Sequence, residues 1–161
     1  MTLIQPAPVQ LAPAGWSELD QVMDVMSVAF DDRYGEAWTR SQCAGILPMR
    51  GVRMIIARDG DTAIGFSLAR TVADESELML LAVSPQARRR GVGSALLDRF
   101  ILEARSTGAR RLHLEVRDGN PAVEMYHRHG FEIQGRRSKY YKGSDGVLHD
   151  ALTMVRPASF D

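Results

Sequence analysis

A short glycine-containing segment joins an apolar, strand-like run to an amphipathic helical run, and this junction constrains the fold more than any other feature. The strand-like run covers residues 78–83, the helical run covers 95–104, and between them lies Arg88-Arg89-Arg90-Gly91-Val92-Gly93-Ser94. Two glycines let the backbone approach a ligand closely, and the first turn of a helix offers unpaired N–H groups to an anion. The three arginines add positive charge. The junction therefore predicts a phosphate-binding turn.

Two other phosphate motifs do not fit this segment. A dinucleotide-binding fingerprint requires a third glycine at position 96, where the chain has Leu96, and a P-loop requires Gly-Lys-Ser/Thr, which the sequence lacks. Taken alone, the segment is equally compatible with a strand, a basic turn and an ordinary helix.

Composition indicates one globular domain with a proper core, because the 161 residues are 45% hydrophobic and 25% charged. Twenty basic and twenty acidic side chains cancel, so no global field favours nucleic acid or an anionic membrane. Cys43 is the single cysteine, which excludes an internal disulfide and is compatible with a reducing compartment. We expect a cytoplasmic protein, and neither nucleic acid nor a membrane as a partner.

The first fifteen residues carry three prolines and no basic residue, so they lack the charged start of a secretory signal. We expect residues 1–15 to form a flexible arm, residues 16–157 a single domain, and residues 158–161 a tail.

Periodicity predicts the elements of the first half of the chain. Apolar residues at helical spacing indicate a helix over 19–30 with Ser17 as its cap, and Thr39 and Gln42 form a capping box for a short helix through 46–47. Strands are expected at 54–57, 64–72 and 77–83, the first two joined by a turn at Asp59-Gly60.

Residues 110–116 alternate, so Leu112, Leu114 and Val116 face one way while Glu115 lies on the opposite face. Asn120-Pro121 caps a helix that ends before residue 130, and strands at 131–134 and 148–155 flank a polar loop that carries two tyrosines. These elements predict an α/β protein with a mixed sheet and helices on its faces.

Four segments in this order resemble the GNAT superfamily of acetyl-CoA-dependent N-acetyltransferases, over about residues 19–155. The resemblance rests on Leu81-Ala82-Val83-Ser84-Pro85, the 88–94 turn, Leu114-Glu115-Val116-Arg117 with Asn120, and Met125-Tyr126 with Gly130-Phe131. It implies a GNAT-like fold, with a mostly antiparallel central sheet and about four helices, and acetyl-CoA as co-substrate without a metal. A narrower resemblance, to the RimI-type enzymes that acetylate the N-terminal alanine of a small-subunit ribosomal protein, rests on residues 114–117, Arg136-Arg137, Tyr140-Tyr141 and Asp150-Ala151.

The resemblance also assigns a cofactor site. It implies that backbone groups of Leu81, Ala82 and Val83 pair with the pantetheine arm, and that N–H groups of residues 89–94 hold the pyrophosphate. Asn120 matches a position that contacts the cofactor in these enzymes, and it fits a plain helix cap equally well.

Amide formation requires a base for the incoming ammonium and an acid for the departing thiolate. Glu115 and Tyr126 match these two family positions. A free α-amino group has a reference pKa of about 7.7 to 8.0, against about 10.4 for lysine, so an N-terminal acceptor demands less of a glutamate. Tyrosine, with a reference pKa near 10, stays protonated at neutral pH.

The same residues also fit other assignments. Without the resemblance, Glu115 fits a solvated strand residue and Tyr126 an aromatic at the edge of the core. His113, on the same strand face as Glu115, is the alternative base because its reference pKa lies near neutrality. The two-residue spacing of His127 and His129 argues against a metal pair on a helix.

Cys43 has the chemistry of a covalent acetyl carrier, because thiolates are good nucleophiles. It lies outside every matched motif and has no histidine next to it in sequence. We therefore expect direct transfer in a ternary complex.

Two segments are expected to flank the acceptor: the first lies between the first two helices and the second between the last two strands. Their candidate residues are Asp31, Asp32, Glu36 and Trp38 in the first, and Tyr140 and Tyr141 in the second. An acidic rim suits a peptide amine or a basic second residue, and it equally fits any solvated loop. The chain departs from the RimI-type pattern at residues 35–37, which precede the tryptophan, and at residues 147–149. These departures affect the expected identity of the acceptor and leave the expected fold unchanged.

Three functions remain open from the sequence. The first is an N-terminal protein acetyltransferase, with a ribosomal protein as candidate acceptor, and the second is a GNAT enzyme for a small amine. The third is a non-catalytic acyl-CoA-binding module, which needs neither Glu115 nor Tyr126. The arginine cluster alone supports a nucleic-acid role, and a monomer is compatible with the sequence.

Overall fold

The structure, a computed structural model, describes residues 9–160. Within this range the chain forms a seven-stranded sheet in the order β1-β2-β3-β4-β5-β7-β6, with four α-helices. The strands are β1 (Gln10–Ala14), β2 (Val52–Asp59), β3 (Thr62–Val72), β4 (Glu75–Val83), β5 (Arg111–Arg117), β6 (Glu132–Lys142) and β7 (Leu148–Pro157). The helices are α1 (Leu19–Ala29), α2 (Arg40–Ile46), α3 (Val92–Ser106) and α4 (Ala122–Arg128). The predicted mixed, mostly antiparallel α/β architecture is confirmed.

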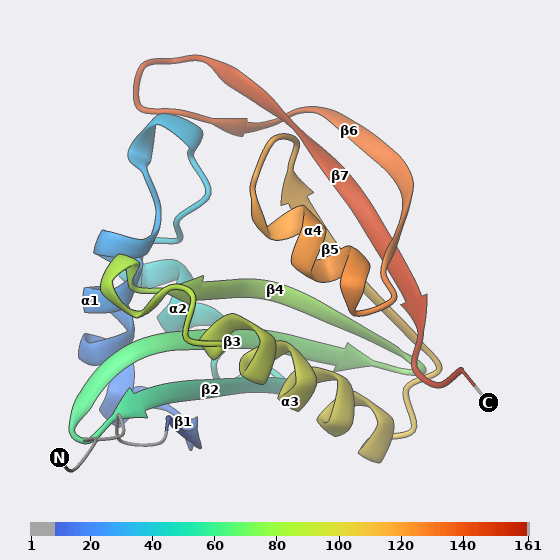
Figure 1. Ribbon diagram of the computed structural model, residues 1–161, viewed down its shortest axis with the longest axis horizontal. Coiled ribbons are helices and arrows are strands. Elements are labelled where there is room, and N and C mark those ends of the chain that lie inside the picture. The colour runs from blue at the N-terminus through green and yellow to red at the C-terminus, as the bar shows by residue number, and fades with distance from the viewer. Residues whose placement is uncertain (1–8, 161) are drawn as a thin grey trace, which may run out of the picture.

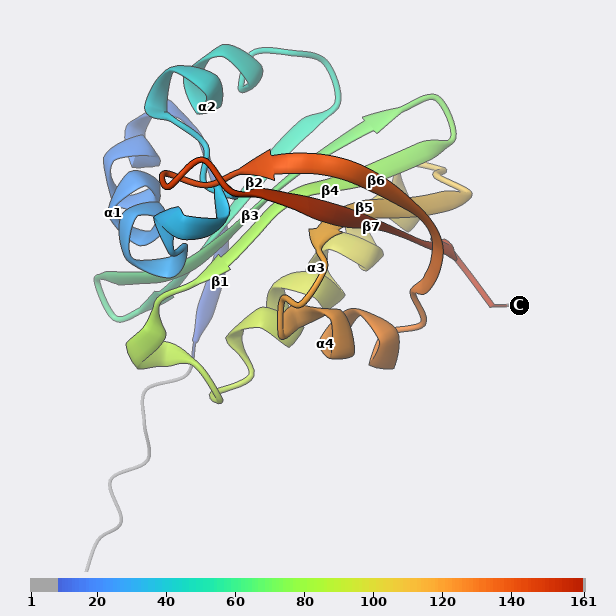
Figure 2. The same ribbon diagram turned by 90° about the horizontal axis from the view of Figure 1, so that it is seen from above.

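The helices lie in two layers, with α1 and α2 on one face of the sheet and α3 and α4 on the other (Figure 2). Burial of apolar side chains holds both layers in place, because removing them from water is the main favourable term in folding. Val22 of α1 packs with Phe66 and Leu80 of the sheet, and Phe100 of α3 packs with Leu114 on the opposite face.

Strands β4 and β5 form the one parallel pair among the described residues, and they separate part of the way along. Their pairing runs from Glu75 and Arg111 to Leu78 and Leu114, after which the strands diverge (Figure 1). Residues 81–83 therefore face a gap on the β5 side while they remain paired with β3 on the other. This divergence makes room for a ligand in the middle of the sheet.

Local sequence signals account for several element boundaries. The Thr39 hydroxyl accepts the N–H of Gln42 at 3.1 Å, and the Gln42 side chain accepts the N–H of Thr39 at 2.8 Å, so the capping box is confirmed. The predicted turn at Asp59-Gly60 joins β2 and β3, with Gly60 in the left-handed region. The prediction that Ser17 caps the first helix is wrong, because residues 16–18 form a 3₁₀ turn before α1.

Both ends of the domain extend beyond the predicted limits. Residues 10–14, expected in a flexible arm, form β1 and pair with β2; Pro13 is tolerated because β1 is an edge strand. Residues 1–8 of that predicted arm lie outside the described residues. At the other end Ala158 is buried and donates its N–H to the carbonyl of Arg110 at 2.9 Å, so the predicted tail begins inside the packed domain.

The last hairpin, formed by β6 and β7, is longer than predicted. The strand predicted over 131–134 runs as β6 to Lys142, so Tyr140 and Tyr141 lie in the strand and not in a loop. The far end of this hairpin reaches the segment between α1 and α2 (Figure 1), where the N–H of Ser144 donates to the carbonyl of Asp32 at 2.9 Å. The two segments expected to flank the acceptor therefore touch each other. Within the described residues, no helix has the length and apolarity required to cross a membrane.

Candidate active site

Strand alternation places Glu115 as predicted. Leu114 and Val116 are buried on the α3 side, while the Glu115 side chain lies on the opposite face and is 10% exposed. Its Oε2 accepts the Thr153 hydroxyl at 2.7 Å, and its Oε1 lies 3.1 Å from Nε of Arg137. These contacts from β7 and β6 fix the orientation of the carboxylate.

Helix α4 carries Tyr126 into the interior. Its ring is buried and meets Phe131 edge-to-face, with 6.1 Å between the ring centroids. Burial, and secondarily the charge of Glu36, hold the pKa of Tyr126 well above the ordinary value for tyrosine. The phenol is therefore a proton donor at neutral pH.

Two adjoining cavities lie where β4 and β5 separate. The first, the glycine-turn cleft, is lined by Leu81, Ala82, Val83, Arg88, Arg89, Gly91, Val92, Gly93 and Ser94 together with residues of α4. The second, the tyrosine pocket, is lined by Trp38, Glu77, Glu115, Tyr140 and Tyr141 among others. Of the described residues, five line both: Phe30, Glu36, Leu81, Asn120 and Tyr126. Tyr126 thus lies at the junction of the cavities, and Glu115 lies in the tyrosine pocket.

The glycine turn has the shape that the sequence predicts. Gly91 adopts a left-handed conformation immediately before α3, and the first N–H groups of α3 lie beyond the reach of intrahelical acceptors. A Cβ atom on Gly93 would lie 3.2 Å from Sδ of Met125, so glycine keeps the cleft open at this point. Free N–H groups at a helix N-terminus and an open backbone fit the pyrophosphate of a CoA molecule.

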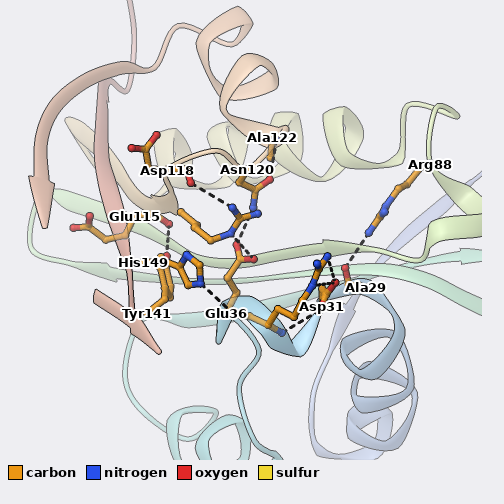
Figure 3. A network of polar contacts seen from close by, with 12 residues as sticks. Ala29, Asp31, Glu36, Arg88, Glu115, Asp118, Asn120, Ala122, Tyr141 and His149 are labelled. Atoms are coloured by element: carbon orange, nitrogen blue, oxygen red, sulfur yellow. Dashed lines mark hydrogen bonds and ion pairs between the residues drawn. The ribbon is translucent and has the colours of Figure 1, made fainter. Parts of the chain in front are cut away.

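The three arginines of the turn have different partners. Arg88 donates to the carbonyl of Ala29 at 2.9 Å (Figure 3) and lines the cleft, as does Arg89. Arg90 instead forms an ion pair with Asp59, with 3.1 Å between Nη1 and Oδ2. Positive charge beside the predicted anion site therefore comes from Arg88 and Arg89.

Asn120 performs its predicted capping role and a second one. Its Oδ1 accepts the N–H of Ala122 at 2.9 Å, which caps α4, and its Nδ2 donates to Oε2 of Glu36 at 2.8 Å (Figure 3). The cofactor contact assigned to Asn120 stays a prediction.

Glu36 does not lie on an open acidic rim. Its side chain is 10% exposed, and its Oε1 accepts from Nε of Arg117 at 3.2 Å. Arg117 in turn stacks over Tyr34, with 3.6 Å from Cζ to the ring centroid. Sequence reasoning gave Arg117 no role, because an arginine at the end of a strand resembles any solvated residue until its burial is known.

The other candidate acceptor residues divide between pocket and surface. Trp38, Tyr140 and Tyr141 line the tyrosine pocket, and the Tyr141 hydroxyl donates to the Glu115 carbonyl at 3.4 Å (Figure 3). Asp31 is exposed and paired with Arg33, which lowers the pKa of Asp31. It therefore offers less free negative charge than the sequence suggests.

The alternative reactive residues are either paired with another side chain or buried in the core. His113 faces Glu77, with 3.7 Å between Nε2 and Oε2, and hydrogen bonding to that carboxylate raises the pKa of His113. Cys43 is buried in the core beside α1, and burial raises the pKa of its thiol. In the part of the chain that the structure describes, no group of three or more His, Cys, Asp or Glu residues is arranged to hold a metal ion.

Comparison with known proteins agrees with this geometry. The Acetyltransferase (GNAT) family matches residues 19–131, and the chain belongs to this family. It is an acetyl-CoA-dependent N-acetyltransferase. It is 34% identical over 123 residues to the [ribosomal protein bS18]-alanine N-acetyltransferase of Escherichia coli K12. The matched region covers 76% of this chain and 82% of the relative.

Solved structures show the same fold. The crystal structure of the ribosomal-protein-S18-alanine N-acetyltransferase from Escherichia coli superposes with a TM-score of 0.84 at 27% identity, over 96% of each chain. The crystal structure of Arabidopsis thaliana NAA60 in complex with acetyl-CoA superposes with a TM-score of 0.79 at 18% identity, over 93% of this chain and 98% of that one. At this identity the likeness supports the fold alone.

Proposed function

We propose that this enzyme acetylates the α-amino group of a protein N-terminus, by direct transfer within a ternary complex. The observation that carries the proposal is the position of Tyr126 at the junction of the glycine-turn cleft and the tyrosine pocket, with Glu115 in the pocket. The Escherichia coli relative is a ribosomal protein bS18-alanine N-acetyltransferase, so an alanine-initiated ribosomal protein is the proposed acceptor. The cytoplasm is the proposed location.

The glycine-turn cleft is the proposed binding site for acetyl-CoA, which supplies an acetyl group on a thiol leaving group. Backbone groups of residues 81–83 are free to pair with the pantetheine arm because β4 has left β5 at this point. The N–H groups of residues 89–94, with Arg88 and Arg89 beside them, bind the pyrophosphate. Tyr126 lines this cleft, so the thioester of the bound cofactor is proposed to lie beside its hydroxyl.

Glu115 is the proposed general base. It removes a proton from the incoming ammonium through a water, so that the nitrogen lone pair is free to attack the thioester carbonyl. Contacts with Thr153 and Arg137 hold the carboxylate in one orientation toward the pocket. The lower reference pKa of an α-amino group, about 8 against about 10.4 for lysine, matches a glutamate base to a chain terminus.

Tyr126 is the proposed general acid. Its buried hydroxyl is neutral, and it donates its proton to the departing thiolate at the junction of the two cavities. Trp38, Tyr140 and Tyr141 frame the pocket for the first residues of the acceptor. Because Cys43 is held in the core, direct attack on the thioester is proposed rather than a thiol-borne intermediate.

Intact-mass analysis with defined acceptors tests this function. Alanine-initiated, lysine-free peptides with free or blocked N-termini are incubated with acetyl-CoA and the enzyme, alongside polyamines, amino sugars and amino acids. Acetylation of the free-ended peptides alone is expected. Acetylation of small amines without peptide modification would overturn the proposal and indicate a small-molecule enzyme.

A further inference from the structure

Strand β6 contains a bulge opposite Asp150. Arg137 pairs with Ala151 and Tyr141 pairs with His149, so residues 138–140 lie opposite the single residue Asp150. Within this bulge Lys139 has a φ of 56°, in the left-handed region that a residue with a side chain adopts only at an energetic cost. A conformation of this kind persists where surrounding contacts hold it.

The Asp150 carboxylate supplies these contacts. Its Oδ1 accepts the backbone N–H of Lys139 at 3.0 Å, and its Oδ2 accepts from Nη1 of Arg136 at 3.0 Å. One carboxylate therefore joins the strained residue to the regular strand that precedes it. Both hydrogen bonds favour the ionised form, and they lower the pKa of Asp150.

The bulge changes which side chains reach the tyrosine pocket. Consecutive residues of a regular strand face opposite sides of a sheet, yet Tyr140 and Tyr141 both line this pocket. Arg137, just before the bulge, reaches Oε1 of Glu115, and Tyr141, just after it, reaches the Glu115 carbonyl. In a regular strand Arg137 and Tyr141 would share one face and Tyr140 would point to the other, so it is the bulge that brings Tyr140 into the same pocket as Tyr141.

We propose that Asp150 is a positioning residue for the acceptor: its carboxylate holds Lys139 in the left-handed conformation and so turns Tyr140 and Tyr141 toward the acceptor's first residues. The inference rests on the proposed function in that it assigns the tyrosine pocket to the acceptor. Asp150 acts through the tyrosines and contacts neither substrate.

Steady-state kinetics of Asp150→Ala test the proposal, with the acceptor that the wild-type enzyme uses best. The KM for the acceptor should rise about tenfold, the size expected for loss of one charge-assisted hydrogen bond, while the KM for acetyl-CoA changes less than about twofold. Adding Lys139→Gly to this variant should lower the acceptor KM again, most of the way to the wild-type value, because glycine adopts the left-handed conformation without help. A merely destabilised protein would not show this rescue.

Asp118→Asn is the matched control. Asp118 also pairs with Arg136, at 2.7 Å, but the Lys139 N–H is bound by Asp150, so the acceptor KM should change less than about twofold. If Asp150→Ala does not fold, Asp150→Asn replaces it; this variant keeps an oxygen for the Lys139 N–H but loses the charge, and the acceptor KM should rise about threefold. An unchanged acceptor KM in the folded variant overturns the proposal.

Hydrogen exchange of the Lys139 amide separates this inference from the proposed function. It should accelerate at least about tenfold in Asp150→Ala, whatever the acceptor, because that amide loses its partner. If the wild-type enzyme acetylates only small amines, the N-terminal proposal fails and the same comparison is made with the amine. Unchanged exchange in the folded variant would overturn the role of Asp150 even if peptides are acetylated.

Discussion

The side-chain amide of Asn120 donates a 2.8 Å hydrogen bond to Glu36, which lies 84 residues earlier in the chain. The same Asn120 caps α4 at Ala122, so the helix that carries Tyr126 is tied to the segment between α1 and α2. Both residues line both cavities. The junction between the proposed cofactor and acceptor sites is therefore held by a partly buried polar network.

Glu115→Gln should lower kcat by a factor of about 10² to 10⁴, the usual contribution of a positioned general base. Calorimetric affinity for acetyl-CoA should stay within about twofold, because Glu115 lines the tyrosine pocket. Glu77→Gln, which changes another carboxylate of the same pocket, is the control and should lose far less activity. Equal turnover of wild type and Glu115→Gln would remove Glu115 as the base.

Gly93→Trp should abolish acetyl-CoA binding, measured by calorimetry. The added side chain begins 3.2 Å from Met125 and extends into the glycine-turn cleft, so it displaces the ligand. Leu102→Trp, on the exposed side of the same helix, should bind acetyl-CoA normally. Binding by Gly93→Trp with wild-type affinity would contradict the cleft assignment.

Tyr126 and Tyr141 should titrate only when the protein unfolds at high pH. Burial raises the pKa of both above their unfolded value of about 10. A raised folded pKa means that the stabilisation from these phenols is complete below pH about 10 and is lost as pH rises toward the folded value. Absorbance titration of tyrosinate should show a late component that disappears in urea, where all four tyrosines titrate near 10.

That late component should shrink in Tyr126→Phe and again in Tyr126→Phe/Tyr141→Phe. Full ionisation of all tyrosines near pH 10 in the folded wild type would show that neither phenol is buried as described.

Arg117→Leu should destabilise the fold by about 3 to 5 kcal/mol in urea unfolding, because it leaves the buried Glu36 carboxylate without its ion-pair partner. The double variant Glu36→Leu/Arg117→Leu should recover part of that loss, since no uncompensated charge then remains. If the loss of stability in the double variant equalled the sum of the losses in the two single variants, Glu36 and Arg117 would not be energetically coupled.

Cys43→Ser should keep turnover close to wild type, because the thiol lies in the core beside α1 and takes no part in direct transfer. The serine hydroxyl in an apolar site should lower stability, which urea unfolding measures. Loss of turnover in a folded Cys43→Ser protein would make a covalent acetyl carrier the better explanation.

Periodicity and short motifs predicted the position of a residue correctly where that position depends only on the residue's own strand, turn or helix. Alternation in β5 placed Glu115, the 88–94 turn predicted the cleft, and Asn120 was recognised as a cap. Edge strand β1 was missed because Pro13 and neighbouring prolines are typical of loose segments, and only the edge position makes Pro13 acceptable.

Features that depend on distant partners were not predictable in the same way. The far end of β6 was expected to be a loop because Arg136 to Lys142 is polar, and its strand state comes from pairing with β7 around the bulge at Lys139. Burial of Glu36 depends on Arg117, which follows it by 81 residues. A pattern within a short window does not contain either relationship.

Binding of a single molecule that joins both substrates shows whether acetyl-CoA and a chain terminus meet at Tyr126. An alanine-initiated peptide is linked through its α-nitrogen and an acetyl group to the sulfur of CoA, and its affinity is measured by calorimetry against CoA and the free peptide. We expect the conjugate to bind at least about 100-fold tighter than either part, because the joined cavities accept both ends at once. A conjugate that binds no tighter than CoA would show that the peptide has no site beside the thioester and that the two substrates do not meet at Tyr126.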